Sequence, residues 1–174
     1  AASAGSGANG VVSLLFQGAG GVLGPAVVYS SVPVRVAGEL HVADMNGDGL
    51  KDIVLQSGLL QLAVIKQTAP DAFSTSPDFY TVQTGYWSVF DSFALGDLNR
   101  DGRTDIAVAD ITGNLNIFLQ NANGVLTGPT IRGGSSASEV DIADVDGGGL
   151  GDIVLVYLGC AVDIRLQGVD PGRS

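Results

Sequence analysis

The stretch DMNGDGLKD, residues 44–52, decides how this chain is interpreted, because oxygen-bearing side chains recur at every second position around a glycine. A second copy, DLNRDGRTD, spans residues 97–105, and a looser third copy, DVDGGGLGD, spans residues 144–152. Successive copies begin 53 and 47 residues apart. A loop that recurs at this spacing predicts a chain built from repeated structural units.

The segments that flank the three Asp loops predict β-strands. Alternating segments precede the loops, at residues 39–43, 92–96 and 139–143. Their apolar residues are expected on one buried face: Leu40 and Val42, Phe93 and Leu95, Val140 and Ile142. Apolar runs rich in β-branched residues follow the loops, starting at Ile53, Ile106 and Ile153, and indicate more fully buried strands. Each Asp loop is therefore expected to join two strands of a hairpin.

A glycine-rich turn recurs independently of the Asp loops. QGAGGVL at residues 17–23 matches QNANGVL at residues 120–126, and both are typical of hairpin turns. The repeated unit is therefore strand, Asp loop, strand, short turn, strand, glycine turn and strand. In the middle of the chain, QTAPDAFSTSPD is expected to be a longer connection before the last strand of its unit. Four strands in about 40–50 residues is the size of a propeller blade.

The sequence thus predicts an all-β fold of propeller blades, each with four antiparallel strands, and thirteen strands in total. We expect a half blade at residues 10–30, blades at 36–83 and 88–132, and an incomplete blade at 138–168. Propellers typically have about four to eight blades, because each blade buries its faces against its neighbours. About three blades therefore make a partial propeller, which is either a segment of a larger one or one completed by association.

The Asp loops have the chemistry of a site for a hard cation. Positions 1, 3, 5 and 9 carry oxygen ligands, and the glycine at position 6 permits the sharp turn. Five or more flexible oxygen ligands favour Ca²⁺ over Mg²⁺. Turn propensity explains single Asp, Asn or Gly residues but not this ordered spacing twice. The ligands predicted in the first two loops are the side chains of Asp44, Asn46, Asp48, Asp52, Asp97, Asn99, Asp101 and Asp105, with the carbonyls of Leu50 and Arg103.

The third loop departs from this pattern at position 5, where Gly148 replaces an aspartate. Asp146 at position 3 restores the number of carboxylates, so we expect a weaker site or one completed by water. Its predicted ligands are Asp144, Asp146, the carbonyl of Leu150, and Asp152. An EF-hand is excluded, because position 12 requires a bidentate glutamate and holds Leu55 or Val108 in the first two loops.

These loops, each following an alternating strand and separated by glycine-rich hairpins, resemble the FG-GAP/VCBS repeat over nearly the whole chain. That repeat builds the calcium-binding propeller of integrin α-subunit heads and of many secreted bacterial proteins. The resemblance implies a propeller of about seven blades, in which each calcium loop joins the first two strands of a blade on one face. The family's ligand positions carry over fully to the first two loops and only partly to Asp144, Asp146 and Asp152. The number of blades departs from the family.

Composition excludes several classes of partner. The net charge of −10 disfavours nucleic acid and anionic membrane surfaces, which attract basic proteins. No apolar run approaches the roughly 20 residues of a spanning helix, so we expect no membrane insertion. Millimolar extracellular Ca²⁺ would fill even weak sites by mass action, which favours a secreted or cell-surface location.

No catalytic site is expected. His41 is the only histidine, and Ala94 and Asp141 occupy the equivalent positions of the other repeats, so it is interpreted as a strand residue. The favoured function is a non-catalytic calcium-binding module for extracellular adhesion or for interaction with a protein or other ligand. In that interpretation the calcium is structural. The partner is a protein or glycan, and the chain either forms a homo-oligomer or belongs to a larger propeller.

Two alternatives stay open. Tyr86, Trp87 and Phe90 would form a stacking platform for a sugar, which predicts a carbohydrate-binding, lectin-like module. Trp87 would instead fill a gap between blades if that platform is absent. The chain would also suit an accessory domain of a secreted polysaccharide-degrading enzyme, an alternative that rests on fold analogy.

Overall fold

The computed structural model describes residues 11–29, 37–84, 90–110, 112–133, 137–157 and 161–165. These residues form fifteen strands and no helix, which confirms the all-β prediction. Among them there is no helix long and apolar enough to cross a membrane. Tyr86 and Trp87 lie outside the described residues, and only the backbone of Phe90 is described.

Four antiparallel sheets contain most of the strands, and we number them in chain order. The first sheet pairs β1 (Val12–Leu14) with β2 (Val27–Tyr29). The second has the order β3 (Ala37–Ala43), β4 (Asp52–Ser57), β5 (Gln61–Ile65) and β8 (Asp78–Thr81). The third runs β9 (Phe90–Gly96), β10 (Asp105–Asp110), β11 (Asn114–Gln120) and β12 (Leu126–Gly133). The fourth comprises β13 (Ala137–Ala143), β14 (Asp152–Tyr157) and β15 (Ala161–Arg165).

The long connection expected in the second sheet contains a small hairpin of its own. β6 (Gln67–Ala69) pairs with β7 (Ala72–Phe73), and these are the two strands beyond the thirteen expected. Asp71 closes the turn with a φ of 63°, a left-handed conformation that aspartate tolerates better than most residues. Because the hairpin is only two to three residues long on each side, it leaves little periodic signal in the sequence.

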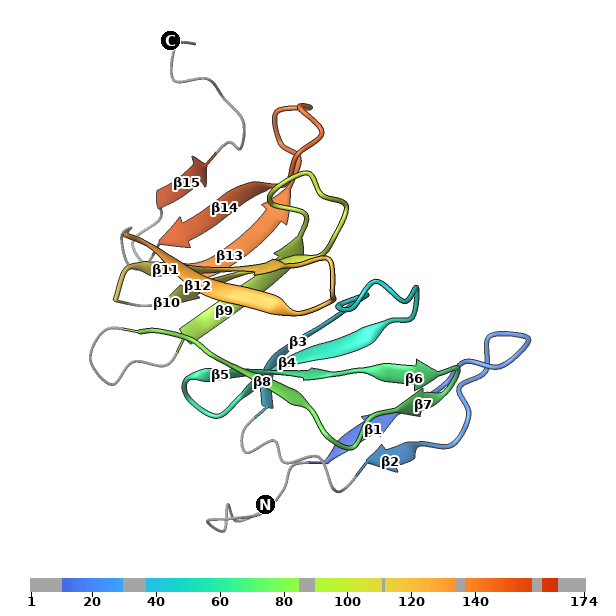
Figure 1. Cartoon of the computed structure of the whole chain (residues 1–174). Coiled ribbons are helices and arrows are strands. Elements are labelled where there is room, and N and C mark those ends of the chain that lie inside the picture. Colours follow the sequence, from blue (N-terminus) through green and yellow to red (C-terminus); the bar gives the residue numbers. More distant parts are fainter. Residues whose placement is uncertain are drawn as a thin grey trace.

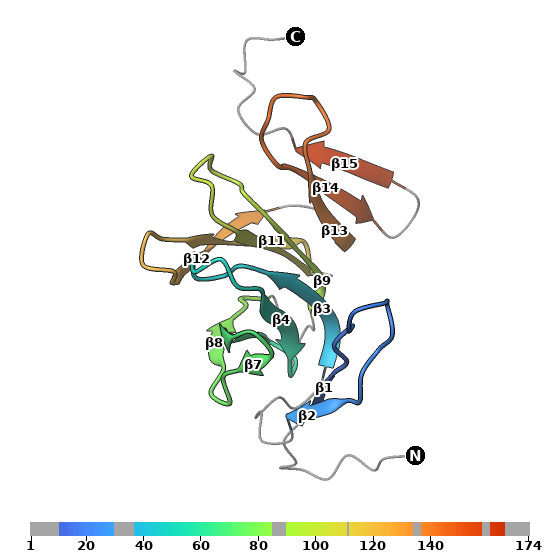
Figure 2. The same cartoon turned by 90° about the vertical axis from the view of Figure 1, so that its right-hand side faces the viewer.

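The sheets follow one another through the molecule (Figures 1 and 2). A cluster of apolar side chains joins each sheet to the next. Between the second and third sheets, Val54, Leu62 and Val64 pack against Phe93 and Phe118. A second cluster joins the third sheet to the fourth, and a third cluster joins the first sheet to the second. All six residues of β4 and all six of β10 are buried, as predicted for the strands after the Asp loops.

One predicted buried face is wrong at the second sheet. Phe93 and Val140 are buried in their first strands, but Leu40 and Val42 are 51% and 54% exposed. The adjacent sheet explains this exposure: the first sheet has only two strands among the described residues, and their apolar side chains pack against β4 and β5. Burial of a strand face thus depends on how many strands the adjacent sheet supplies.

Polar contacts reinforce the joints between sheets. Glu39 in β3 accepts a hydrogen bond of 2.8 Å from the amide of Phe93, and Ser92 accepts one of 3.4 Å from the amide of Val140. Glu39 and Ser92 occupy the same position of successive repeats. Gly96 also approaches the next sheet closely, since a Cβ at this position would lie 2.4 Å from Cγ2 of Ile142.

Candidate metal sites

Each Asp loop connects the first and second strands of its sheet, so the predicted hairpins are confirmed. Ala43 pairs with Asp52, Gly96 with Asp105, and Ala143 with Asp152. The ninth loop residue is therefore also the first residue of the second strand. The three loops project on the same side of the molecule (Figure 1).

The aspartate at position 1 organises its own loop by accepting backbone hydrogen bonds. Asp44 accepts from the amides of Gly47 and Gly49 at 2.7 and 2.8 Å. The amide of Gly102 donates in the same way to Asp97 at 2.8 Å, and that of Gly149 to Asp144 at 2.9 Å. Burial raises the pKa of Asp44 and of Asp97, but the donated amides outweigh it and hold each pKa below its ordinary value.

The aspartate at position 9 is buried in all three loops, with no exposed surface at Asp52, Asp105 or Asp152. Asp52 accepts from the amides of Met45 and Gln67, both at 2.8 Å, and Asp105 accepts from Leu98 and Gln120 at 2.9 and 2.8 Å. Burial raises the pKa of Asp52 and of Asp105, the amides lower it, and neighbouring loop carboxylates raise it further, so each pKa lies above its ordinary value. A cation beside these carboxylates would favour the charged form that burial disfavours.

The third loop brings its carboxylates together. Asp144, Asp146 and Asp152 place ligand oxygens within 4.8 Å of one another, the one such group among the described residues. This trio could hold a metal ion, although the sequence predicted the weakest site here. Asp146 supplies at position 3 the carboxylate that position 5 lacks.

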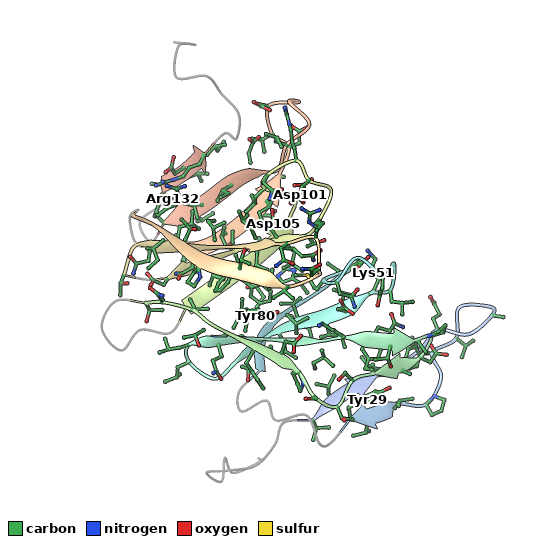
Figure 3. All side chains as sticks on the ribbon, viewed as in Figure 1. Tyr29, Lys51, Tyr80, Asp101, Asp105 and Arg132 are labelled. Carbon is green, nitrogen blue, oxygen red and sulfur yellow. The ribbon has the colours of Figure 1, made fainter. Side chains whose placement is uncertain are left out.

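In the first two loops the carboxylate at position 5 has a neighbouring partner. The side-chain amide of Asn46 donates to Asp48 at 2.9 Å, and the guanidinium of Arg103 pairs with Asp101. Asp101 and Asp105 lie near each other at the β9–β10 loop (Figure 3). The predicted carboxylates of these two loops therefore do not come together as those of the third loop do, and Asp48 and Asp101 would have to exchange partners to contact a cation.

The backbone of every Asp loop is left-handed at two positions, of which the sequence indicated only the glycine at position 6. Position 4 also has a positive φ: 78° at Gly47, 64° at Arg100 and 75° at Gly147. Glycines at position 4 of the first and third loops were the available signal. Arg100 adopts this conformation without being glycine, which costs about 1–2 kcal/mol relative to right-handed backbone.

Neighbouring loops contact each other directly. The guanidinium of Arg100 donates to the carbonyl of Gly148 at 2.8 Å, and the amide of Gly151 donates to the carbonyl of Asp97 at 3.4 Å. These bonds join the second loop to the third. A cation in one loop would therefore stiffen backbone that contacts the next.

The donor chemistry fits Ca²⁺. Carboxylate oxygens meet in the third loop, and the first two loops carry carboxylate and amide oxygens; both are ligands that a hard divalent cation prefers. Carbonyl ligation by Leu50, Arg103 and Leu150 stays a prediction.

His41 packs at the joint between the second and third sheets. Nε2 of His41 lies 3.1 Å from Oε1 of Glu39 without a hydrogen bond, and its ring stands edge-on to Phe93 with centroids 4.7 Å apart. This position at a sheet joint fits a packing residue. The proposed stacking platform of Tyr86, Trp87 and Phe90 stays a prediction, because its side chains lie outside the described part of the chain.

Comparison with known proteins supports the repeat. Residues 97–155, from the second Asp loop into β14, match the family model described as an FG-GAP-like repeat. Over these residues the match confirms the resemblance to an FG-GAP-like repeat that the sequence indicated. No curated protein matches the chain.

Among solved structures, the chain is similar to the one described as the crystal structure of BBS1N in complex with ARL6DN, soaked with lead. The identity is 14%, the match covers 76% of this chain and 57% of that chain, and the TM-score is 0.35. The chain thus spans 57% of that relative's length. A similarity of this degree supports no statement about function.

Proposed function

We propose that this chain is a non-catalytic calcium-binding module of the β-propeller type, in which Ca²⁺ is structural and the assembled sheets present a surface for a protein or glycan partner. The FG-GAP-like repeat and the blade-like sheets support the general class. We further propose that the module lies outside the cell or on its surface, where Ca²⁺ is abundant.

The observation that carries the proposal is the buried aspartate at position 9 of each loop. Asp52, Asp105 and Asp152 are buried beside loops that hold two further carboxylates each, and burial of like charges is unfavourable without a counter-ion. In this proposal Asp44, Asn46, Asp48 and Asp52 would hold one Ca²⁺, and Asp97, Asn99, Asp101 and Asp105 another. Asp144, Asp146 and Asp152 would hold a third.

Bound calcium would link the two strands of each hairpin. Position 1 follows the first strand, position 9 begins the second, and both would contact the same ion. An ion that binds only the folded chain stabilises it by mass action, by about 2.7 kcal/mol for each site at a concentration 100 times its Kd.

Thermal unfolding with Ca²⁺ and with a chelator tests this proposal. We expect millimolar Ca²⁺ to raise the Tm of the chelator-treated chain by about 5–10 °C for each site present at 100 times its Kd, because about 1 kcal/mol shifts the Tm of a domain this size by about 2–4 °C. Mg²⁺ at the same concentration is the matched control and should raise the Tm less, since it demands stricter geometry. Equal Tm values with Ca²⁺ and EDTA would show that the loops need no cation.

A further inference from the structure

Among the described residues, the fourth sheet ends at β15, where the second and third sheets have one strand more. In the second sheet β8 pairs with β5, and in the third sheet β12 pairs with β11. β15 occupies the same place as β5 and β11, but in the described part of the chain it pairs only with β14. An edge strand presents backbone donors and acceptors to which another extended segment can add.

A groove of about 330 Å³ lies between the third sheet and the β14–β15 pair. Its floor is apolar, and two arginines from different sheets contribute to its lining. These residues are Leu115, Ile117, Leu119, Ile153, Arg132 and Arg165. Arg132 lies on the side of the third sheet toward β15 (Figure 3). The groove therefore combines an apolar floor with positive charge beside an open strand edge.

The joint between the second and third sheets shows what such a groove holds when it is filled. There Phe118 on β11 and Leu126 on β12 are 1% and 6% exposed and pack against the second sheet. Phe118 pairs with Ile106, and Arg165 pairs with the equivalent Ile153, so Arg165 stands in the place of Phe118. Leu126 comes from a fourth strand, which has no counterpart among the described residues of the fourth sheet. The groove is therefore where the inward side chains of a fourth strand would pack.

The positive charge at the groove favours an acidic ligand. Arg132 and Arg165 are two of only eight basic residues in a chain of net charge −10. Nε of Arg165 lies 3.3 Å from the carboxylate of Asp163, and both side chains are more than a third exposed. Exposed ion pairs of this kind contribute little free energy, so Arg165 can exchange Asp163 for another carboxylate. A carboxylate that enters the groove would gain charge-assisted hydrogen bonds from a guanidinium.

We propose that β15 and the adjacent groove bind an extended acidic peptide segment of a separate partner by β-strand addition. Its backbone pairs with the free edge of β15, and its inward apolar side chains cover Leu115, Ile117 and Ile153. Its carboxylate contacts Arg165 and Arg132. Backbone pairing supplies affinity in this mode, and the pockets for alternate side chains supply specificity.

A labelled synthetic peptide tests the proposal by fluorescence anisotropy with the full chain in Ca²⁺. The probe has the sequence of residues 76–84 with Pro77→Glu, because β8 is the fourth strand of the second sheet. Asp78 pairs with Val64, so position 77 stands beside Ile65, which corresponds to Arg165. The glutamate should therefore approach Arg165. We expect saturable binding that the same peptide with an added Tyr80→Pro loses, since proline removes a backbone donor.

Variants of the chain locate the binding site. Arg165→Ala and Arg132→Ala should each weaken binding at least fivefold, and both together at least twentyfold. Lys51→Ala, an equal change of charge in the first Asp loop, away from the groove, should alter it less than twofold. Because Arg132 and Arg165 lie on different sheets, loss of fold in one variant leaves the other informative, and circular dichroism checks both.

Three outcomes would overturn the proposal. The first is binding that neither arginine variant weakens. The second is a chain that sediments as a dimer and becomes monomeric with Arg165→Ala, which would make a second copy the occupant. The third is peptide binding that requires removal of residues 166–174, which would assign the groove to the chain's own C-terminal segment.

Discussion

At the scale of single residues, the aspartate at position 9 of each loop is both a predicted cation ligand and a buried acceptor of backbone hydrogen bonds. Spacing predicted that Asp52, Asp105 and Asp152 follow the turn, but not that each is fully buried and accepts backbone amides. Those amide donors include Gln67 and Gln120, which lie 15 residues further along the chain. Hydrogen bonds of this kind depend on tertiary structure, so local sequence patterns do not reveal them.

Asp105→Ala should lower the free energy of unfolding by about 2–4 kcal/mol even in EDTA, because the buried amides of Leu98 and Gln120 lose their acceptor. Asp105→Asn should cost less, since its carbonyl oxygen keeps one of the two bonds. Urea unfolding of both variants in EDTA measures the difference. If alanine were tolerated as well as asparagine, these hydrogen bonds would contribute little to stability.

Arg100 offers a second prediction at this scale, because it combines a left-handed backbone with a contact to the next loop. Arg100→Gly removes the strain and the contact, whereas Arg100→Ala removes only the contact. The glycine variant should therefore be more stable than the alanine variant by about 1 kcal/mol, or about 2–4 °C in Tm. Thermal unfolding in Ca²⁺ measures the difference in Tm between the two variants. Equal Tm values would show that the backbone of Arg100 is not strained.

At the scale of elements, the hairpins followed from alternation and from the repeated loops, whereas their burial did not. The pattern of Leu40 and Val42 matches that of Phe93 and Leu95, yet only the latter pair faces a sheet that covers it. The β6–β7 hairpin was also missed, because its strands are too short to show a period. Local pattern thus specified the strands, and the neighbouring sheet decided which faces are covered.

The close approach of Gly96 to the fourth sheet gives a prediction at this scale. Gly96→Ala should destabilise the chain by about 1–3 kcal/mol, because its Cβ would overlap Cγ2 of Ile142. Combining it with Ile142→Ala should recover part of that loss, so a double-mutant cycle should show coupling of about 1 kcal/mol. Gly18→Ala, where the nearest atom would be 3.7 Å away, is the matched control. Additive losses would show that the two residues do not meet.

At the scale of the whole molecule, an apolar cluster joins each pair of successive sheets, and each Asp loop lies at the same end of its sheet. The repeat period predicted this arrangement, because equivalent residues recur in equivalent strands. It did not predict the contacts between loops, such as Arg100 with Gly148, since these depend on the angle between adjacent sheets. Nor did it predict the groove beside β15, which reflects the strand that the described part of the fourth sheet lacks.

The central claim is that these loops are calcium sites, and calcium stoichiometry tests it most directly. Equilibrium dialysis of the chelator-stripped chain against radioactive Ca²⁺ should reach two to three ions per chain at millimolar concentration. Asp44→Ala, Asp97→Ala and Asp144→Ala should each remove no more than one ion, because each loop would bind its own. A chain that takes up no calcium in a saturable manner, or whose uptake is unchanged when all three aspartates are replaced, would contradict this assignment.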